Sequence, residues 1–178
     1  MPSLIRIAPV ILFASSTLAA ADAYRVFRAD GSPAALEDIL RAAQSQSVVF
    51  LGENHDDPTA HKLQAEIFRK LFETRGAPMA LSLEMFERDV QPVLNEFLAG
   101  LIPEDQFLAA SRPWKNYKTD YKPLVDFAKE KKLPVIAANA PRRYVSRVGR
   151  EGAAGLEVLS PAAKQWIAPL PYAEASPP

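Results

Sequence analysis

Apolar residues along this chain fall into short β-type runs that alternate with helically spaced stripes. Three runs rich in aliphatic and β-branched residues, 48–53, 79–86 and 134–140, predict strands. The runs are continuously apolar rather than alternating, which is typical of parallel strands that are buried on both faces. Apolar residues at helical spacing between the runs predict crossover helices. We therefore predict an α/β fold, in which helices flank a parallel sheet core with three visible strands.

Capping residues and prolines indicate where several helices begin. A Ser or Asp side chain accepts hydrogen bonds from the first turn of a helix, and proline suits the first helical position. On this basis the helix caps are predicted at Ser32, Asp57, Asp89 and Ser160. Gly76 is expected to end the helix that Asp57 begins.

Polar side chains gather where each predicted strand ends. The first run leads into Glu53 and His55, the second contains Glu84, and the third ends at Asn139. Because parallel strands bring their carboxyl ends to one edge of a sheet, we expect these four side chains to converge on one crevice. His61, about one turn into the following helix, is expected to face the same crevice.

Carboxylate and imidazole groups together suit a divalent metal or acid–base catalysis. The candidate metal ligands are Glu53, His55, Glu84 and His61. In a hydrolase, Glu53, His55 and Glu84 would be the catalytic residues, with the metal activating water.

A purely structural interpretation of the same residues stays open. Asp56 and Asp57 are suited to capping a helix and interacting with its positive end. His55 is compatible with a hydrogen-bonded turn residue. Glu84 is compatible with an ion pair to an arginine of the Arg142-Arg143 pair.

A second candidate region, residues 111–123, interleaves aromatic and basic side chains. It contains Trp114, Tyr117 and Tyr121 together with one arginine, Arg112, and three lysines. Aromatic faces suit a flat ligand and cations suit its carboxylates, and a tyrosine oxygen can ligate haem iron. The alternative is an exposed loop with one aromatic side chain turned inward.

Two arginines follow the third predicted strand. Arg142 and Arg143 stand at the start of a predicted helix, where they can hold an anion. Alternatively, they form ion pairs with Glu84 or Asp89.

Composition and the first residues bear on location and partners. The 21 basic and 21 acidic residues cancel, which argues against a nucleic-acid-binding protein because such proteins usually carry a basic excess. Residues 1–23 have the layout of a secretory signal peptide with cleavage after Ala23. The chain has no cysteine, so we expect neither disulfides nor a lipid-modified cysteine. The mature chain is expected to be soluble and periplasmic or secreted.

The motifs together resemble the ChaN-like haem-binding uptake family, within the wider Tiki and erythromycin-esterase-like grouping. The resemblance extends from about residue 48 to the tail. The matching segments are 52–58 with His61 and Gln64, 83–88, 111–114 with Tyr117 and Tyr121, and 138–144.

The resemblance implies an exported haem-binding protein of iron acquisition, with outer-membrane haem uptake machinery as a partner. It also implies a homodimer that encloses paired haems, with each iron held by a tyrosine. Tyr117 or Tyr121 would be that ligand, with Tyr117 favoured. The other haem contacts are expected at Arg112, Trp114, Asn139 and Arg142. Because relatives in the wider grouping are metal-dependent peptidases and an esterase, a metal-dependent hydrolase is the alternative.

The chain departs from the family pattern in three respects. Many relatives carry two adjacent histidines where this chain has Ala60-His61. Some relatives are lipoproteins, whereas this chain has no cysteine that could be lipid-modified. The family domain normally continues further, so the three strands are expected to belong to a larger ChaN-like domain. We expect residues 24–168 to form the N-terminal portion of that domain and residues 169–178 to form a proline-rich tail.

Overall fold

A computed structural model of the chain describes residues 24–76 and 78–172. The predicted signal peptide lies outside these residues. The elements, in chain order, are β1 (Val26–Phe27), β2 (Pro33–Ala34), α1 (Leu36–Ala43), α2 (Pro58–Arg75), β3 (Leu81–Glu87), the 3-10 helix η1 (Arg88–Val90), α3 (Gln91–Leu98), α4 (Glu104–Ser111), the π-helix η2 (Tyr117–Tyr121), α5 (Lys122–Glu130), β4 (Val135–Asn139), α6 (Arg142–Glu151), the 3-10 helix η3 (Ala153–Leu156) and α7 (Pro161–Lys164). Among the described residues, no helix is both long and apolar enough to cross a membrane.

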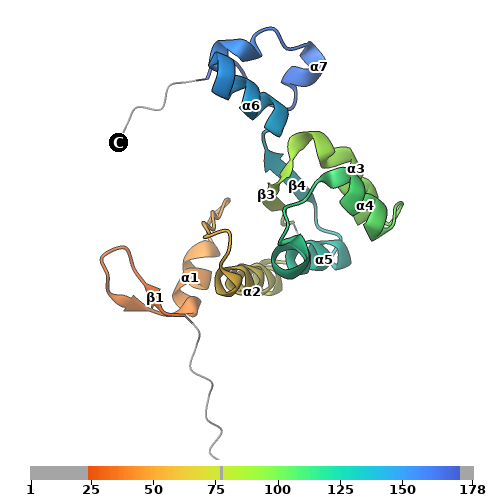
Figure 1. The fold of residues 1–178 in the computed structure, drawn as a ribbon. Coiled ribbons are helices and arrows are strands. Elements are labelled where there is room, and N and C mark those ends of the chain that lie inside the picture. Colours follow the sequence, from red (N-terminus) through yellow and green to blue (C-terminus); the bar gives the residue numbers. More distant parts are fainter. Residues whose placement is uncertain (1–23, 77, 173–178) are drawn as a thin grey trace, which may run out of the picture.

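The central sheet confirms the predicted α/β class. Strands β3 and β4 pair in parallel, with Leu81 opposite Val135 and Leu83 opposite Ala137. Figure 1 shows this pair in the middle of the molecule, with α2 and α5 below it and α3 and α4 beside it. The first strands and α1 lie at one end, and α6 and α7 lie at the other. The main core is aromatic and aliphatic, and its fully buried members include Phe86, Leu94, Phe107, Val125 and Ala128.

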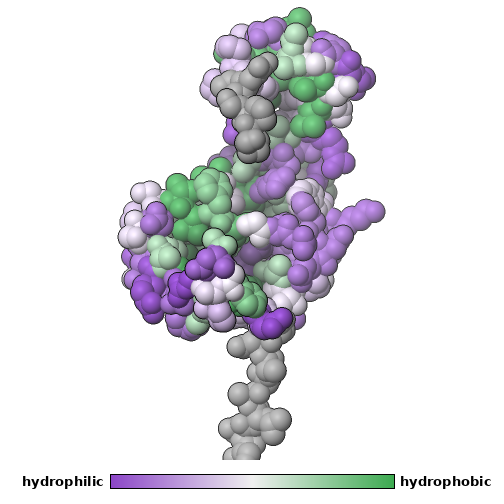
Figure 2. Space-filling model, turned by 90° about the vertical axis from the view of Figure 1, so that its left-hand side faces the viewer, coloured by the Kyte–Doolittle hydropathy of each residue, from purple (hydrophilic) through white to green (hydrophobic). Residues whose placement is uncertain are grey.

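The predicted strand over residues 48–53 is wrong. This segment has no regular secondary structure, and Val48 and Phe50 are 66% and 91% exposed. Figure 2, which views the side of the molecule that carries this segment, shows apolar surface there. A run of apolar and β-branched residues indicates that a segment is suited to a β-sheet. A strand also needs a neighbouring backbone, and in the described structure this segment makes no backbone hydrogen bond with β3 or β4. Within the described residues, the parallel sheet therefore has two strands instead of three.

Two of the four predicted helix caps are confirmed. The Asp57 carboxylate accepts hydrogen bonds from the backbone N–H groups of Thr59 (2.9 Å) and Ala60 (3.2 Å). The Ser160 hydroxyl accepts one from the N–H of Ala163. Helix α2 ends at Gly76 as predicted, with a φ of 66° that glycine adopts without strain.

The other two predicted caps are wrong. Ser32 precedes the short strand β2, and α1 starts four residues later, at Leu36. The residue before it, Ala35, is the N-cap, and its N–H donates to the Asp38 carboxylate. Asp89 lies within η1, and α3 begins without a side-chain cap. The Asp89 carboxylate forms ion pairs with arginines instead, and these are described with the site below.

One side chain takes the place of a neighbouring strand at the far edge of β4. The Gln91 amide donates to the carbonyl of Val135 (2.8 Å), and its oxygen accepts from the N–H of Ala137 (2.7 Å). A residue of a paired strand would satisfy the same two backbone groups. Gln91 therefore joins α3 to the sheet and closes an edge that would otherwise be open.

Replacing Gln91 tests this edge contact. We expect Gln91→Ala to lower the free energy of unfolding by about 1–3 kcal/mol, because two partly buried backbone groups lose their partners. Asn95→Ala is the matched control, since Asn95 contacts the same amide but not the strand. We expect the control to cost less than about 0.5 kcal/mol in urea denaturation. Equal losses in the two variants would contradict the edge role.

Candidate functional site

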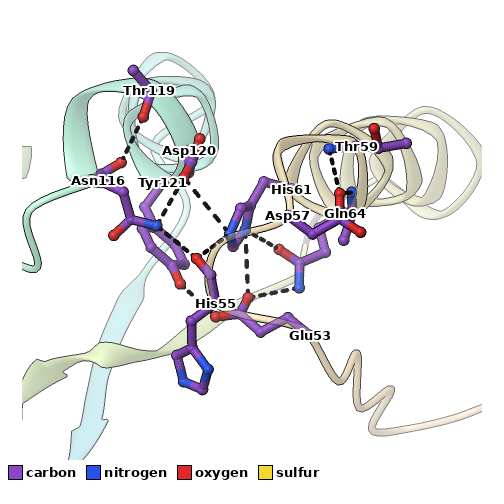
Figure 3. Close-up of polar contacts among 11 residues, drawn as sticks. Glu53, His55, Asp57, Thr59, His61, Gln64, Asn116, Thr119, Asp120 and Tyr121 are labelled. Carbon is purple, nitrogen blue, oxygen red and sulfur yellow. Dashed lines mark hydrogen bonds and ion pairs between the residues drawn. The ribbon is translucent and has the colours of Figure 1, made fainter. Parts of the chain in front are cut away.

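The segment between residues 53 and 57 meets α2 at a buried histidine. The Asp57 cap turns the chain into α2, and His61, one turn later, is 1% exposed. Gln64 follows three residues on, so its side chain lies on the same face of the helix. The two predicted site residues Glu53 and His61 are brought together here (Figure 3).

Both nitrogens of the His61 ring face oxygen atoms. Nδ1 lies 3.1 Å from Oε1 of Gln64 and 3.5 Å from Oε2 of Glu53. Nε2 lies 3.1 Å from the backbone carbonyl of His55 and 3.7 Å from Oδ2 of Asp120. The imidazole is therefore held between two carboxylates, with a neutral acceptor beside each nitrogen.

This arrangement favours the doubly protonated imidazolium. The Gln64 amide donates to Glu53 (2.8 Å), which leaves its oxygen turned toward Nδ1 of His61. Each ring nitrogen then has an acceptor opposite it and needs a proton to donate. Burial acts to lower the pKa of His61, but the hydrogen bonds to His55 and Gln64 and the two carboxylates outweigh it. The pKa of His61 is consequently raised above its ordinary value of 6.5.

The π-helix η2 and the residue before it close the cluster from the other side. Asn116 uses its amide to donate both to the carbonyl of His55 (2.9 Å) and to Asp120 (2.7 Å). The Tyr121 hydroxyl donates to Glu53, and its ring meets that of His61 edge-on at 4.8 Å. The turn of a π-helix brings residues five apart into register, and such turns are frequent at functional sites.

We call this set the His61 cluster; its members are Glu53, His61, Gln64, Asn116, Asp120, Tyr121 and the carbonyl of His55. It joins the segment before α2 and the first turns of α2 to residues 116–121, which are distant in sequence from both. The side chain of His55 is not a member, because it points away from the cluster (Figure 3) and is exposed. Its ring lies against Trp114, with centroids 4.9 Å apart.

The remaining residues of the predicted crevice do not join the cluster. Glu84 is exposed on β3, and Asn139 is half-buried at the end of β4. Neither side chain makes a hydrogen bond or ion pair within the described structure. Over residues 24–76 and 78–172, no group of three or more acidic or histidine side chains is placed to hold a metal ion. The assignment of metal-ligating and catalytic roles to Glu53, His55 and Glu84 stays a prediction.

The two predicted haem-ligating tyrosines have different surroundings. Tyr117 is 1% exposed and packs against Phe86 and Phe107, and its buried hydroxyl has no hydrogen-bond partner. Burial, with the nearby charges of Asp126 and Glu104, raises the pKa of Tyr117. Tyr121 is 3% exposed. Burial and the hydrogen bond to the neighbouring carboxylate likewise raise its pKa.

Two of the basic residues singled out from the sequence, Arg112 and Arg143, are engaged in ion pairs. Arg112 contacts Asp89 at 2.8 Å and Glu87 at 3.0 Å, and Arg143 also contacts Asp89. Of the two alternatives for the paired arginines, Arg143 therefore takes the ion pair with Asp89. Arg142 is exposed and forms no ion pair in the described structure.

Sequence reasoning missed three members of the His61 cluster as site residues, namely Gln64, Asn116 and Asp120. Gln64 stands three residues after His61 on a predicted helix, and this spacing is the signal that could have identified it as a neighbour of the histidine. Asn116 and Asp120 lie in the segment 111–121, which carried no helical pattern. Only the tertiary arrangement shows that this segment folds back onto α2.

From the contacts of the His61 cluster we predict that the free energy of unfolding depends on pH. Because the folded-state pKa of His61 lies above 6.5, its contribution is complete below the unfolded-state pKa and is lost as pH rises through the folded-state pKa. We expect the free energy of unfolding by urea to fall by about 1 kcal/mol between about pH 5.5 and 8.5, the usual contribution of one hydrogen bond. The control is His55→Ala, which removes the other histidine and should keep this slope, whereas His61→Gln should lose it. A stability that is flat or rises with pH over this range would contradict the arrangement.

Comparison with known proteins finds a curated relative that is similar to part of this chain. A curated protein of Arabidopsis thaliana, "Protein RETICULATA-RELATED 5, chloroplastic", is 27% identical over 115 residues, which are 61% of this chain and 16% of that protein. The chain thus spans a small part of that relative's length. No solved structure matches the chain.

A family model covers most of the chain. The family described as "Haem-binding uptake, Tiki superfamily, ChaN" matches residues 39–178. The match contains α2, the whole His61 cluster, both strands of the parallel sheet and the aromatic and basic segment 111–123. It confirms the resemblance drawn from the motifs, and the chain belongs to the ChaN family of haem-binding uptake proteins in the Tiki superfamily.

Proposed function

We propose that this chain is an exported haem-binding protein that takes part in haem uptake. The observation that carries the proposal is the family match over residues 39–178. Export to the periplasm or beyond is proposed from the signal-peptide layout of residues 1–23. A second copy of the chain and outer-membrane haem uptake machinery are the proposed partners, and both rest on the resemblance to the family.

The surface of the segment 111–123 supports a ligand of this chemistry. Haem presents a flat apolar ring with two carboxylate groups at one edge. Trp114 is half-buried, with part of its indole accessible, and Lys115 and Lys118 are exposed. Neither lysine forms an ion pair with another described residue. This segment therefore offers an aromatic face that suits the flat haem ring. It also offers two free cations that suit the haem carboxylates.

The two tyrosines fit an iron ligand less well in this structure. A tyrosine ligates iron through its oxygen after the proton is lost, and the pKa of Tyr117 and of Tyr121 is raised. The Tyr117 oxygen is buried, and the Tyr121 oxygen is engaged with Glu53. Ligation of iron by Tyr117 or Tyr121 would therefore require these side chains to move. The residues that fit haem without such a movement are Trp114, Lys115, Lys118 and the exposed His55.

A hemin titration of the full chain tests haem binding. We expect the Soret absorbance to increase and then saturate at a fixed ratio of hemin to protein. Lys115→Glu should weaken binding by about two- to fivefold, because it replaces an attraction for the haem carboxylates with a repulsion. Lys62→Glu is the matched control, since Lys62 is exposed on α2 and the net charge changes equally. Absorbance that rises without saturation in the wild type would contradict the proposed function.

A further inference from the structure

His55 combines a fixed backbone with a free, exposed imidazole. We propose that a ring nitrogen of His55 is an axial ligand of the iron in the haem that this protein binds. The proposal rests on the proposed function and names the ligand within it. Neutral imidazole is a common axial ligand of haem iron.

The backbone carbonyl of His55 is held by two side chains of the His61 cluster. Its carbonyl oxygen accepts from the Asn116 amide at 2.9 Å and lies 3.1 Å from Nε2 of His61. The first donor precedes η2 and the second belongs to α2, so the carbonyl is fixed between two helices. A metal ligand carried on a fixed backbone loses little freedom when it binds. The His61 cluster thereby acquires a role, which is to position His55.

The imidazole of His55 is oriented by packing that leaves both of its nitrogens free. Its ring lies 4.9 Å from that of Trp114 at an angle of 40°. Trp114 in turn meets Tyr121 edge-on at 5.8 Å, so the indole is supported by the cluster. Within the described structure the His55 ring nitrogens make no hydrogen bond. Figure 3 shows the ring directed away from the cluster.

The alternative ligands in this part of the chain are enclosed. Of the four histidine and tyrosine side chains between residues 48 and 121, only that of His55 is exposed. His61 is 1% exposed and uses both nitrogens. Tyr117 and Tyr121 are 1% and 3% exposed. A haem that approaches from solvent therefore meets the His55 imidazole first, with the indole of Trp114 beside it.

Resonance Raman spectra of the full chain reconstituted with hemin and then reduced test this ligand. The wild type should show an iron–histidine stretching band. In His55→Ala that band should be lost and hemin should bind about tenfold more weakly or worse, and added imidazole should restore the band. Asp56→Ala is the matched control, because Asp56 is the exposed neighbour whose side chain makes no hydrogen bond. It should retain the wild-type band and affinity.

The outcomes separate this inference from the proposed function. Saturable hemin binding with spectra and affinity that are equal in the wild type and His55→Ala would overturn the His55 ligand and leave haem binding in place. Loss of the iron ligand signature only in Tyr121→Phe or Tyr117→Phe would assign a tyrosine and also overturn it. A wild type that does not bind hemin would overturn both. Because the His55 side chain is exposed, His55→Ala should keep the wild-type melting curve, which verifies that its fold is intact.

Discussion

The position of His61 between two carboxylates is the constraint on which the site depends. Its ring nitrogens face Glu53 and Gln64 on one side and Asp120 and the His55 carbonyl on the other. An unpaired charge would be costly in a side chain that is 1% exposed. Here each proton of the imidazolium meets an acceptor, and the charge is balanced by neighbouring carboxylates. The same contacts tie the segment before α2 to both α2 and η2, although that segment has no regular secondary structure.

A cluster of this kind is better explained by positioning than by stability alone. Buried ion pairs often contribute little net stability, because removing charges from water offsets their attraction. The contribution of the cluster is to hold neighbouring residues in fixed positions. It fixes the carbonyl of His55 from two directions, and through Tyr121 it supports Trp114, on which the His55 imidazole rests. The buried side is therefore occupied by its own hydrogen bonds, and the exposed side carries the imidazole and the indole that a flat iron-containing ligand can meet. We infer that the enclosed polar residues shape the binding surface without contacting the ligand.

The sequence predicted those parts of the fold that depend on local signals. The Asp57 cap and the apolar stripe that follows it define α2, and the two apolar runs around residues 83 and 137 define the parallel pair. The run at 48–53 carries the same signal but forms no strand, because β-propensity does not reveal whether a neighbouring backbone is available. The expected crevice depended on that strand. Glu53 and His61 still meet, because the side chain of Glu53 reaches α2 directly, whereas Glu84 and Asn139 stay apart from them. No sequence pattern indicated the roles of Asn116 and Asp120, because these roles arise from a π-helix that folds against a distant helix.

The protonation state of His61 is the most direct test of this account. Nitrogen-15 NMR of the histidine side chains, recorded as a function of pH, distinguishes the imidazolium from either neutral tautomer. The account predicts that the His61 ring titrates above the ordinary value of 6.5, and that Nδ1 and Nε2 both carry protons at pH values below that midpoint. A titration midpoint of His61 at or below 6.5 would contradict it.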